Sequence, residues 1–203
     1  DIKKSNLSDG DNKIANWYKE KNVKKNEYYL VVGRFVPENN YETMISEFMK
    51  SKTDKDLVLI TNVEKNKFYE ELKQKTKFDK DPRIKFVGTV YDQELLNKIR
   101  ENAYGYIHGH EVGGTNPSLL EALATTGLNL LLDVGFNREV AEEGALYFTK
   151  KNNNLSYLID KLDNISEEDI KILQNRAKQR ISHHYSWKII IRKYEELFLN
   201  YIH

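Results

Sequence analysis

A loop in the middle of the chain holds the residue types best suited to chemistry. His108 and His110 precede Glu111, and the pair Gly113 and Gly114 then leads through small polar residues into a helix opened by proline. Glycines let a backbone approach an oxyanion closely, and the free N–H groups in the first turn of a helix favour negative charge. A diphosphate would fit here, although the same pattern also occurs in tight strand-to-helix turns that bind no ligand.

Glu121 and the two histidines extend this candidate site. Glu121 lies on the first turns of the helix predicted over 117–125, where its carboxylate could accept hydrogen bonds from two ribose hydroxyls; the alternative is a surface glutamate. His108 and His110 alternate at a strand end and share a face, so with Glu111 they could also suggest a metal site. We expect no divalent metal and no cofactor, because the Asp-x-Asp pairs of the chain do not follow a predicted strand.

Alternating strand and helix patterns must position this loop. Short apolar runs predict strands at 28–33, 56–60, 84–88, 104–107, 128–133 and 145–148. Helical spacing predicts helices at 12–21, 41–50, 65–75, 93–102, 117–125, 166–183 and 185–201. Such an alternation indicates an α/β fold, a Rossmann-like doubly wound parallel sheet with a C-terminal helical extension. We expect a lead at 1–27, the Rossmann-like domain at 28–165 and the C-terminal helices at 166–203.

Composition and charge exclude several classes of protein. With 39% hydrophobic and 31% charged residues and a net charge of +1, the 203-residue chain fits a soluble globular protein without the basic surface of a nucleic-acid binder. It contains no run of about 18 apolar residues that could span a membrane, so we expect a cytoplasmic protein. The absence of cysteine excludes disulfides, thiolate metal sites and cysteine nucleophiles.

Three segments in this order resemble a known family. They are Val-Gly-Arg-Phe-Val-Pro-Glu-Asn-Asn at 32–40, Phe-Val-Gly-Thr-Val-Tyr-Asp-Gln-Glu at 86–94, and the loop and helix at 111–124. Together they resemble the C-terminal, donor-binding domain of the retaining GT-B glycosyltransferases of family four, in the rhamnosyltransferase-like branch of capsule and cell-wall synthesis. The resemblance covers about residues 28–198. It implies one half of a GT-B fold, with a nucleotide-sugar donor as partner and dTDP-rhamnose as the donor.

The resemblance also implies roles for individual residues. Arg34 would contact the donor diphosphate, the backbone of residues 114–119 would cradle it, and Glu121 would bind the nucleoside sugar. Arg34, Glu111 and His110 are the expected catalytic residues, His110 by touching the donor sugar or the reaction centre, unless it is a hydrogen-bonded structural histidine. The expected donor-binding residues are Gly33, Arg34, Asn39, Lys65, Val90, Tyr91, Gly113, Gly114, Thr115, Asn116, Pro117, Ser118, Leu119 and Glu121.

Two positions depart from the family's pattern. Asn39 stands where the family usually has a lysine, and Gly113 stands at the first acid of its Glu-x7-Glu motif. Either Glu111 serves the role of that acid, or backbone N–H groups of the glycine pair replace it. Without the lysine, Arg34 is expected to be the main cation facing the leaving diphosphate, with Lys65 able to approach.

A complete enzyme of this family would need a second, N-terminal half that binds the acceptor, so we expect this chain alone to bind the donor without transfer activity. The apolar stripe of the helix predicted at 185–201 would pack mostly on its own domain. Its basic amphipathic face could also meet the inner face of a membrane where lipid-linked acceptors reside.

Two alternatives to a glycosyltransferase function stay open. They are an epimerase-like half-domain, or a stand-alone receiver- or flavodoxin-type module, whose first loop would carry acids rather than Arg34.

Overall fold

The computed structural model describes residues 4–64 and 66–186 and, beyond these, residues 189, 191, 192, 195, 196, 198 and 199. Within this part of the chain six strands form one parallel sheet, in the order β3-β2-β1-β4-β5-β6. They are β1 (Tyr28–Val32), β2 (Asp56–Ile60), β3 (Ile84–Gly88), β4 (Gly105–His108), β5 (Leu128–Leu132) and β6 (Leu146–Phe148). The predicted α/β class and all six predicted strands are confirmed, with strand ends that differ by one residue at most.

Helices connect the strands and cover the sheet. They are α1 (Asn12–Lys21), α2 (Tyr41–Lys50), α3 (Lys67–Thr76), α4 (Gln93–Glu101), α5 (Pro117–Thr125), α6 (Gly135–Ala141), α7 (Asn154–Leu162) and α8 (Glu167–His184), with short 3-10 helices η1 (Pro37–Asn39), η2 (Phe78–Lys80) and η3 (Glu142–Gly144). Helices α6 and α7 were not predicted. None of the helices in the described part of the chain is both long and apolar enough to cross a bilayer.

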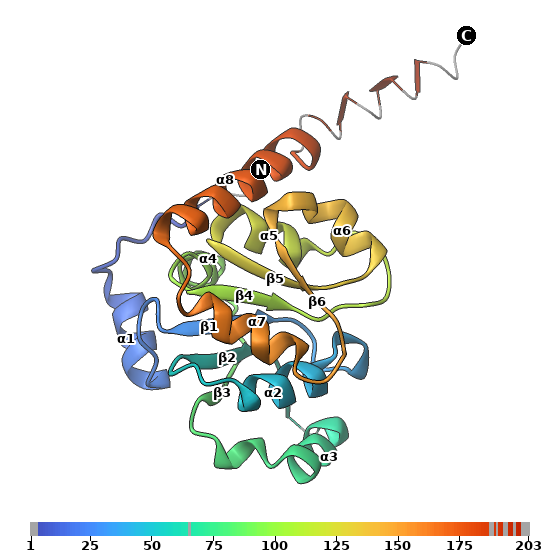
Figure 1. The fold of residues 1–203 in the computed structure, drawn as a ribbon. Coiled ribbons are helices and arrows are strands. Elements are labelled where there is room, and N and C mark those ends of the chain that lie inside the picture. The colour runs from blue at the N-terminus through green and yellow to red at the C-terminus, as the bar shows by residue number, and fades with distance from the viewer. Residues whose placement is uncertain are drawn as a thin grey trace.

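The strand order places a crevice between β1 and β4. The chain runs outward from β1 through β2 to β3, returns through α4 to β4 on the other side of β1, and runs outward again to β6 (Figure 1). The direction of winding therefore reverses between β1 and β4. In open parallel sheets, ligands bind at such a reversal, outside the carboxyl ends of the strands.

Successive side chains of each strand alternate between two helical layers. Tyr29 and Val31 of β1 pack in one cluster with residues of α2, α3 and α7, whereas Tyr28 and Leu30 pack in another with residues of α1 and α4. In Figure 1, α2 and α7 lie over the same side of the sheet. Both faces are thus covered, which explains why the central strand β1 is an unbroken run of apolar and aromatic residues and does not alternate between apolar and polar ones.

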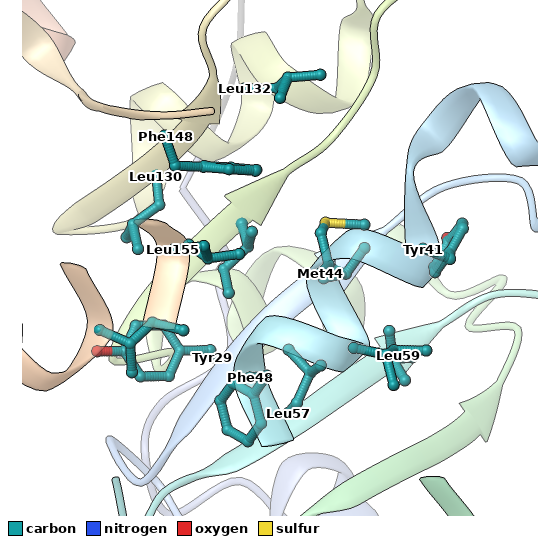
Figure 2. Packing of buried hydrophobic residues seen from close by; sticks show 14 of the residues in the cluster. Tyr29, Tyr41, Met44, Phe48, Leu57, Leu59, Leu130, Leu132, Phe148 and Leu155 are labelled. Atoms are coloured by element: carbon teal, nitrogen blue, oxygen red, sulfur yellow. The ribbon is translucent and has the colours of Figure 1, made fainter. Parts of the chain in front are cut away.

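The larger cluster fixes α2 on the sheet. Met44 and Phe48 of α2 are fully buried, and Figure 2 shows them beside Leu57 and Leu59 of β2. Burial of each such side chain contributes about 1.5–3 kcal/mol. The first turn of α2 is therefore held at the carboxyl end of the sheet, next to the crevice.

The C-terminal helix α8 packs on the sheet through α5. Ala177 and Ile181 of α8 share a cluster with Leu119 and Leu123 of α5, and the predicted N-cap Ser166 accepts a hydrogen bond from the N–H of Asp169 at 3.1 Å. The further helix predicted at 185–201 falls largely outside the described residues, including Trp187, Ile190, Tyr194 and Leu197 of its apolar stripe. Two described members of that stripe, Ile191 and Phe198, are exposed.

Candidate functional site

Two hollows meet at the carboxyl end of β1. The first, the histidine cavity, has a volume of about 210 Å³ and lies between the ends of β1 and β4, where His108 and His110 line it. The second, the Tyr91 cavity, has a volume of about 570 Å³ and lies against the loops that follow β1, β2 and β3. Val32, Gly33 and Arg34 line both. The two hollows therefore adjoin at the point where the winding of the sheet reverses.

Eight of the predicted residues line these hollows. Gly33, Arg34, Asn39, His110, Asn116 and Ser118 line the histidine cavity, and Gly33, Arg34, Val90 and Tyr91 line the Tyr91 cavity. Lys65 lies outside the described residues. Gly113, Gly114, Thr115 and Pro117 are exposed and line neither hollow, and the Leu119 side chain is buried in the core.

Hydrogen bonds tie the loop after β1 to the loop after β4. The side-chain amide of Asn40 donates to the carbonyl of Gly109 at 2.8 Å, and the N–H of Glu111 donates to the carbonyl of Glu38 at 3.3 Å. Gly109 permits this approach, because a Cβ there would lie 2.5 Å from the carbonyl oxygen of Asn39. The two loops therefore form one wall of the histidine cavity.

Asn39 orients His110 within this wall. Its Oδ1 lies 2.7 Å from Nδ1 of His110, and its side-chain amide donates to the carbonyl of Arg34 at 2.7 Å. With the amide in this orientation Oδ1 can only accept, so Nδ1 carries the proton and Nε2 of a neutral His110 can accept a hydrogen bond. Asn137, which is buried, donates to the carbonyl of His110 at 3.2 Å and holds the backbone in place. The asparagine at the family's lysine position thus organises the site through neutral contacts.

His108 is the buried histidine of the pair. Its side chain stacks on Tyr106, with ring centroids 6.0 Å apart, and is 4% exposed. Its Nε2 has no hydrogen-bond partner among the described residues. Burial, assisted by the neighbouring charge of His110, lowers the pKa of His108 to about 3. The imidazole is therefore neutral at any physiological pH.

Arg34 is the cation that the structure places between the two hollows. It is exposed and makes no ion pair with any described residue. By contrast, the nearby cations Lys150 and Arg138 are paired, with Glu111 and Asp133 respectively. Within the described part of the site, Arg34 is thus the cation free to meet an incoming anion.

The two predicted carboxylates lie outside both hollows. Glu111 forms an ion pair with Lys150, and this contact holds the pKa of the Glu111 carboxyl below its ordinary value. Glu121 forms an ion pair at 2.6 Å with Arg100, whose side chain is 1% exposed. Arg100 also donates to Ser118 Oγ at 3.3 Å. Both carboxylates therefore already have cationic partners, and their roles in donor binding stay predictions.

The structure corrects the expectation that the first turn of α5 offers free N–H groups. Pro117 has none, the N–H of Ser118 donates to Oδ1 of its N-cap Asn116 at 2.9 Å, and the N–H of Leu119 donates to the Asn116 carbonyl at 3.0 Å. The N–H groups of residues 112–116, immediately before the helix, donate to no described residue. Any backbone cradle for an anion therefore precedes the helix, and Gly113, with φ of +103°, makes its turn possible.

Several lining residues were not among the predicted ones. Tyr41, Met44 and Gly109 line the histidine cavity, and Phe35, Thr61, Asn62 and Leu96 line the Tyr91 cavity. His108, which the sequence suggested only as a possible metal ligand, also lines the histidine cavity. Tyr41 and Met44 lie on the helix predicted at 41–50, and both are fully buried. Only the position of α2 against the crevice makes them cavity walls as well. Arg100, which supports the site, carried no signal in the sequence, and Asn137 was marked only as the end of a loop at the carboxyl edge of the sheet.

The sequence left His108, His110 and Glu111 open as a possible metal site, although we expected none. Among the described residues no group of three or more histidine, aspartate and glutamate side chains is placed to hold a metal ion. Several acids of the Asp-x-Asp pairs have other partners, such as Lys25 for Asp9 and Arg83 for Asp81.

Solved glycosyltransferase structures share this fold. The chain matches a glycosyltransferase from Rickettsia africae ESF-5 with a TM-score of 0.81 at 17% identity, over 97% of this chain and 55% of that one. It matches Anabaena HepE in complex with UDP with a TM-score of 0.78 at 16% identity, over 96% and 54% of the two chains. The chain thus spans about half the length of these GT-B proteins.

A shorter structure matches over most of its length. It is the C-terminal domain of a glycosyl transferase group 1 family protein (LpcC) from Francisella tularensis, with a TM-score of 0.64 at 19% identity over 85% of this chain and 92% of that one. No curated protein sequence matches the chain significantly. These comparisons favour neither the epimerase-like half-domain nor the stand-alone module. The family model for glycosyl transferases group 1 matches residues 13–184, and this chain therefore belongs to the group 1 glycosyltransferases.

Proposed function

We propose that this chain binds the nucleoside-diphosphate sugar donor of a retaining group 1 glycosyltransferase. The observation that carries the proposal is the pair of adjoining hollows at the end of β1, with the unpaired Arg34 between them. Their volumes together fall within the range of about 300–1,000 Å³ of small-ligand sites. The complexes of Anabaena HepE with UDP and with UDP-glucose support a nucleotide sugar as the ligand class.

The residues that line the two hollows indicate where each part of such a donor would bind. The Tyr91 cavity is mostly apolar, and Val90 and the exposed Tyr91 offer a surface on which a base can stack. Arg34 meets the diphosphate at the boundary, together with the unbonded N–H groups of residues 112–116. The sugar then occupies the histidine cavity, where neutral polar side chains suit its hydroxyls.

In the proposed reaction, the main role of these protein groups is to stabilise the leaving diphosphate. Negative charge develops on that group as the bond between the anomeric carbon of the sugar and the diphosphate oxygen breaks. Positioned cations and N–H dipoles stabilise this charge most where they need no rearrangement. Arg34 supplies the charge, and Nε2 of His110 can accept a hydrogen bond from the donor sugar. No side-chain nucleophile is required, and we propose that no metal ion takes part.

The finer assignments extend the same proposal. We take the donor to be dTDP-rhamnose and the product a bacterial surface polysaccharide. Transfer would require an acceptor-binding half in addition to this domain, which is consistent with the chain spanning about half of the matched structures. We place the protein in the cytoplasm, where it would contact the inner face of the membrane through a lipid-linked acceptor.

Calorimetric titration of the chain with UDP, GDP, dTDP and ADP, first without metal and then with magnesium, tests the proposal. One nucleotide should bind without metal, and Arg34→Ala should weaken it by roughly 10- to 100-fold, because hydrogen bonds to charged groups contribute about 1.5–3 kcal/mol. Arg176→Ala, on the exposed side of α8, is the matched control and should change nothing. If no nucleotide binds, or both arginine variants bind equally well, the proposal fails.

A further inference from the structure

His108 is a buried group that donor binding, as described so far, does not use. Its side chain is 4% exposed and lines the histidine cavity, and Nε2 has no partner among the described residues. Most buried polar side-chain atoms in proteins have a hydrogen-bond partner, and one left without a partner is unfavourable. The protein thus keeps an unpaired polar atom at the wall of its candidate site. A ligand that forms a hydrogen bond with this nitrogen would remove the cost.

The surroundings of His108 favour a neutral, hydroxyl-bearing ligand. The other polar side chains lining this cavity include Asn39, Asn116, Ser118 and Tyr41, all uncharged, and Arg34 stands only at the boundary with the Tyr91 cavity. Burial keeps the His108 imidazole neutral, since its pKa falls to about 3. A neutral imidazole offers one donor and one acceptor, which matches a hydroxyl and does nothing to neutralise a phosphate.

We propose that His108 is a specificity-determining residue that forms a hydrogen bond with a hydroxyl of the donor's sugar. This inference rests on the proposed function, because it assumes that a nucleotide sugar enters the site. A site that leaves a buried polar group unpaired discriminates strongly against an analogue that lacks the matching hydroxyl. His108 would therefore help to select among donors that share one nucleotide, while it leaves recognition of the nucleotide to other residues.

The test compares a nucleotide with its sugar conjugate on the same variants. Calorimetry with UDP and UDP-glucose, and with dTDP and dTDP-rhamnose, is carried out on the wild-type chain, His108→Leu and His108→Gln. For the pair that binds, His108→Leu should weaken the sugar conjugate by about tenfold, the equivalent of one lost hydrogen bond, and leave the free nucleotide unchanged. His108→Gln keeps an amide donor and acceptor and should recover part of that loss. His184→Leu, at the exposed end of α8, is the control.

The outcomes separate this inference from the proposed function. If none of UDP, GDP, dTDP and ADP binds the wild-type chain, the proposed function fails and the role of His108 fails with it. If a nucleotide binds but His108→Leu weakens nucleotide and conjugate equally, or weakens neither, the proposed function stands and His108 has no role in sugar selection. A purely structural role predicts a lower melting temperature for His108→Leu, with equal losses of affinity for both ligands.

Discussion

Acidification should destabilise this protein through His108 before its carboxylates titrate. The ordinary pKa of the imidazole is 6.5, and burial lowers it to about 3 in the folded chain. The unfolded chain therefore binds a proton between these values that the folded chain refuses. The contribution of His108 to stability is complete above pH 6.5 and is lost progressively as the pH falls toward 3.

The loss can be worked from these two pKa values. Between pH 7 and pH 5 the folded histidine stays neutral while the unfolded one becomes almost fully protonated, so the free energy of unfolding should fall by about 2 kcal/mol. The neighbours of His108 do not reverse this effect: burial raises the pKa of Tyr106, and the electrostatic effect of His110 also lowers the pKa of His108.

Urea unfolding at pH 7, 6 and 5 measures this loss against His108→Leu, which cannot titrate at this position. The wild-type protein should lose about 2 kcal/mol more than the variant over this range. Carboxylates whose pKa lies below the ordinary value, such as that of Asp9 at about 2, titrate in both proteins at lower pH and cancel in the difference. Parallel pH profiles for the two proteins would show that His108 is accessible to water in the folded state and would refute the reasoning.

Three further substitutions test the packing and charge pairs around the site, each by urea unfolding at pH 7. Gly109→Ala should lower stability by about 1–3 kcal/mol, because its Cβ would lie 2.5 Å from a backbone carbonyl oxygen, whereas Gly114→Ala, with nothing within 4 Å, should be neutral; equal effects would contradict this. Glu121→Leu should lower the free energy of unfolding by about 3–5 kcal/mol, because it leaves the buried Arg100 unpaired. Arg100→Leu should lower it by less, because Glu121 is 30% exposed to water. A larger loss for Arg100→Leu would be inconsistent with the pair as described. Glu47→Gln should cost about 1.5–3 kcal/mol. Burial raises the pKa of the Glu47 carboxyl, but its lysine partner and the N–H groups at the start of α7 together hold that pKa below the ordinary value. The difference in stability from wild type should therefore shrink as pH falls, and a pH-independent difference would exclude this role.

The sequence by itself determined the class of fold and the position of the candidate loops. Strands and most helices follow from local patterns, because an apolar run or a helical repeat is complete within one segment. The short α6 was missed, since Gly135 and Asn137 give it weak helical character. Helix α7 was missed although Leu155, Leu158, Ile159 and Leu162 have helical spacing. The start of this helix also donates hydrogen bonds to Glu47, a residue distant in the sequence, and no local pattern shows such a contact.

Only the tertiary structure decided which side chains face the hollows. The spacing of the central loop and the resemblance pointed to His110, Asn116 and Ser118 as donor-site residues, and in the structure all three line the histidine cavity. The same spacing could not show that Glu111 and Glu121 pair with lysine and arginine from other elements, because an ion pair depends on which elements meet in space. Local sequence patterns determine what each segment becomes, whereas the partner of a charged side chain is set by packing between segments that are far apart in the chain.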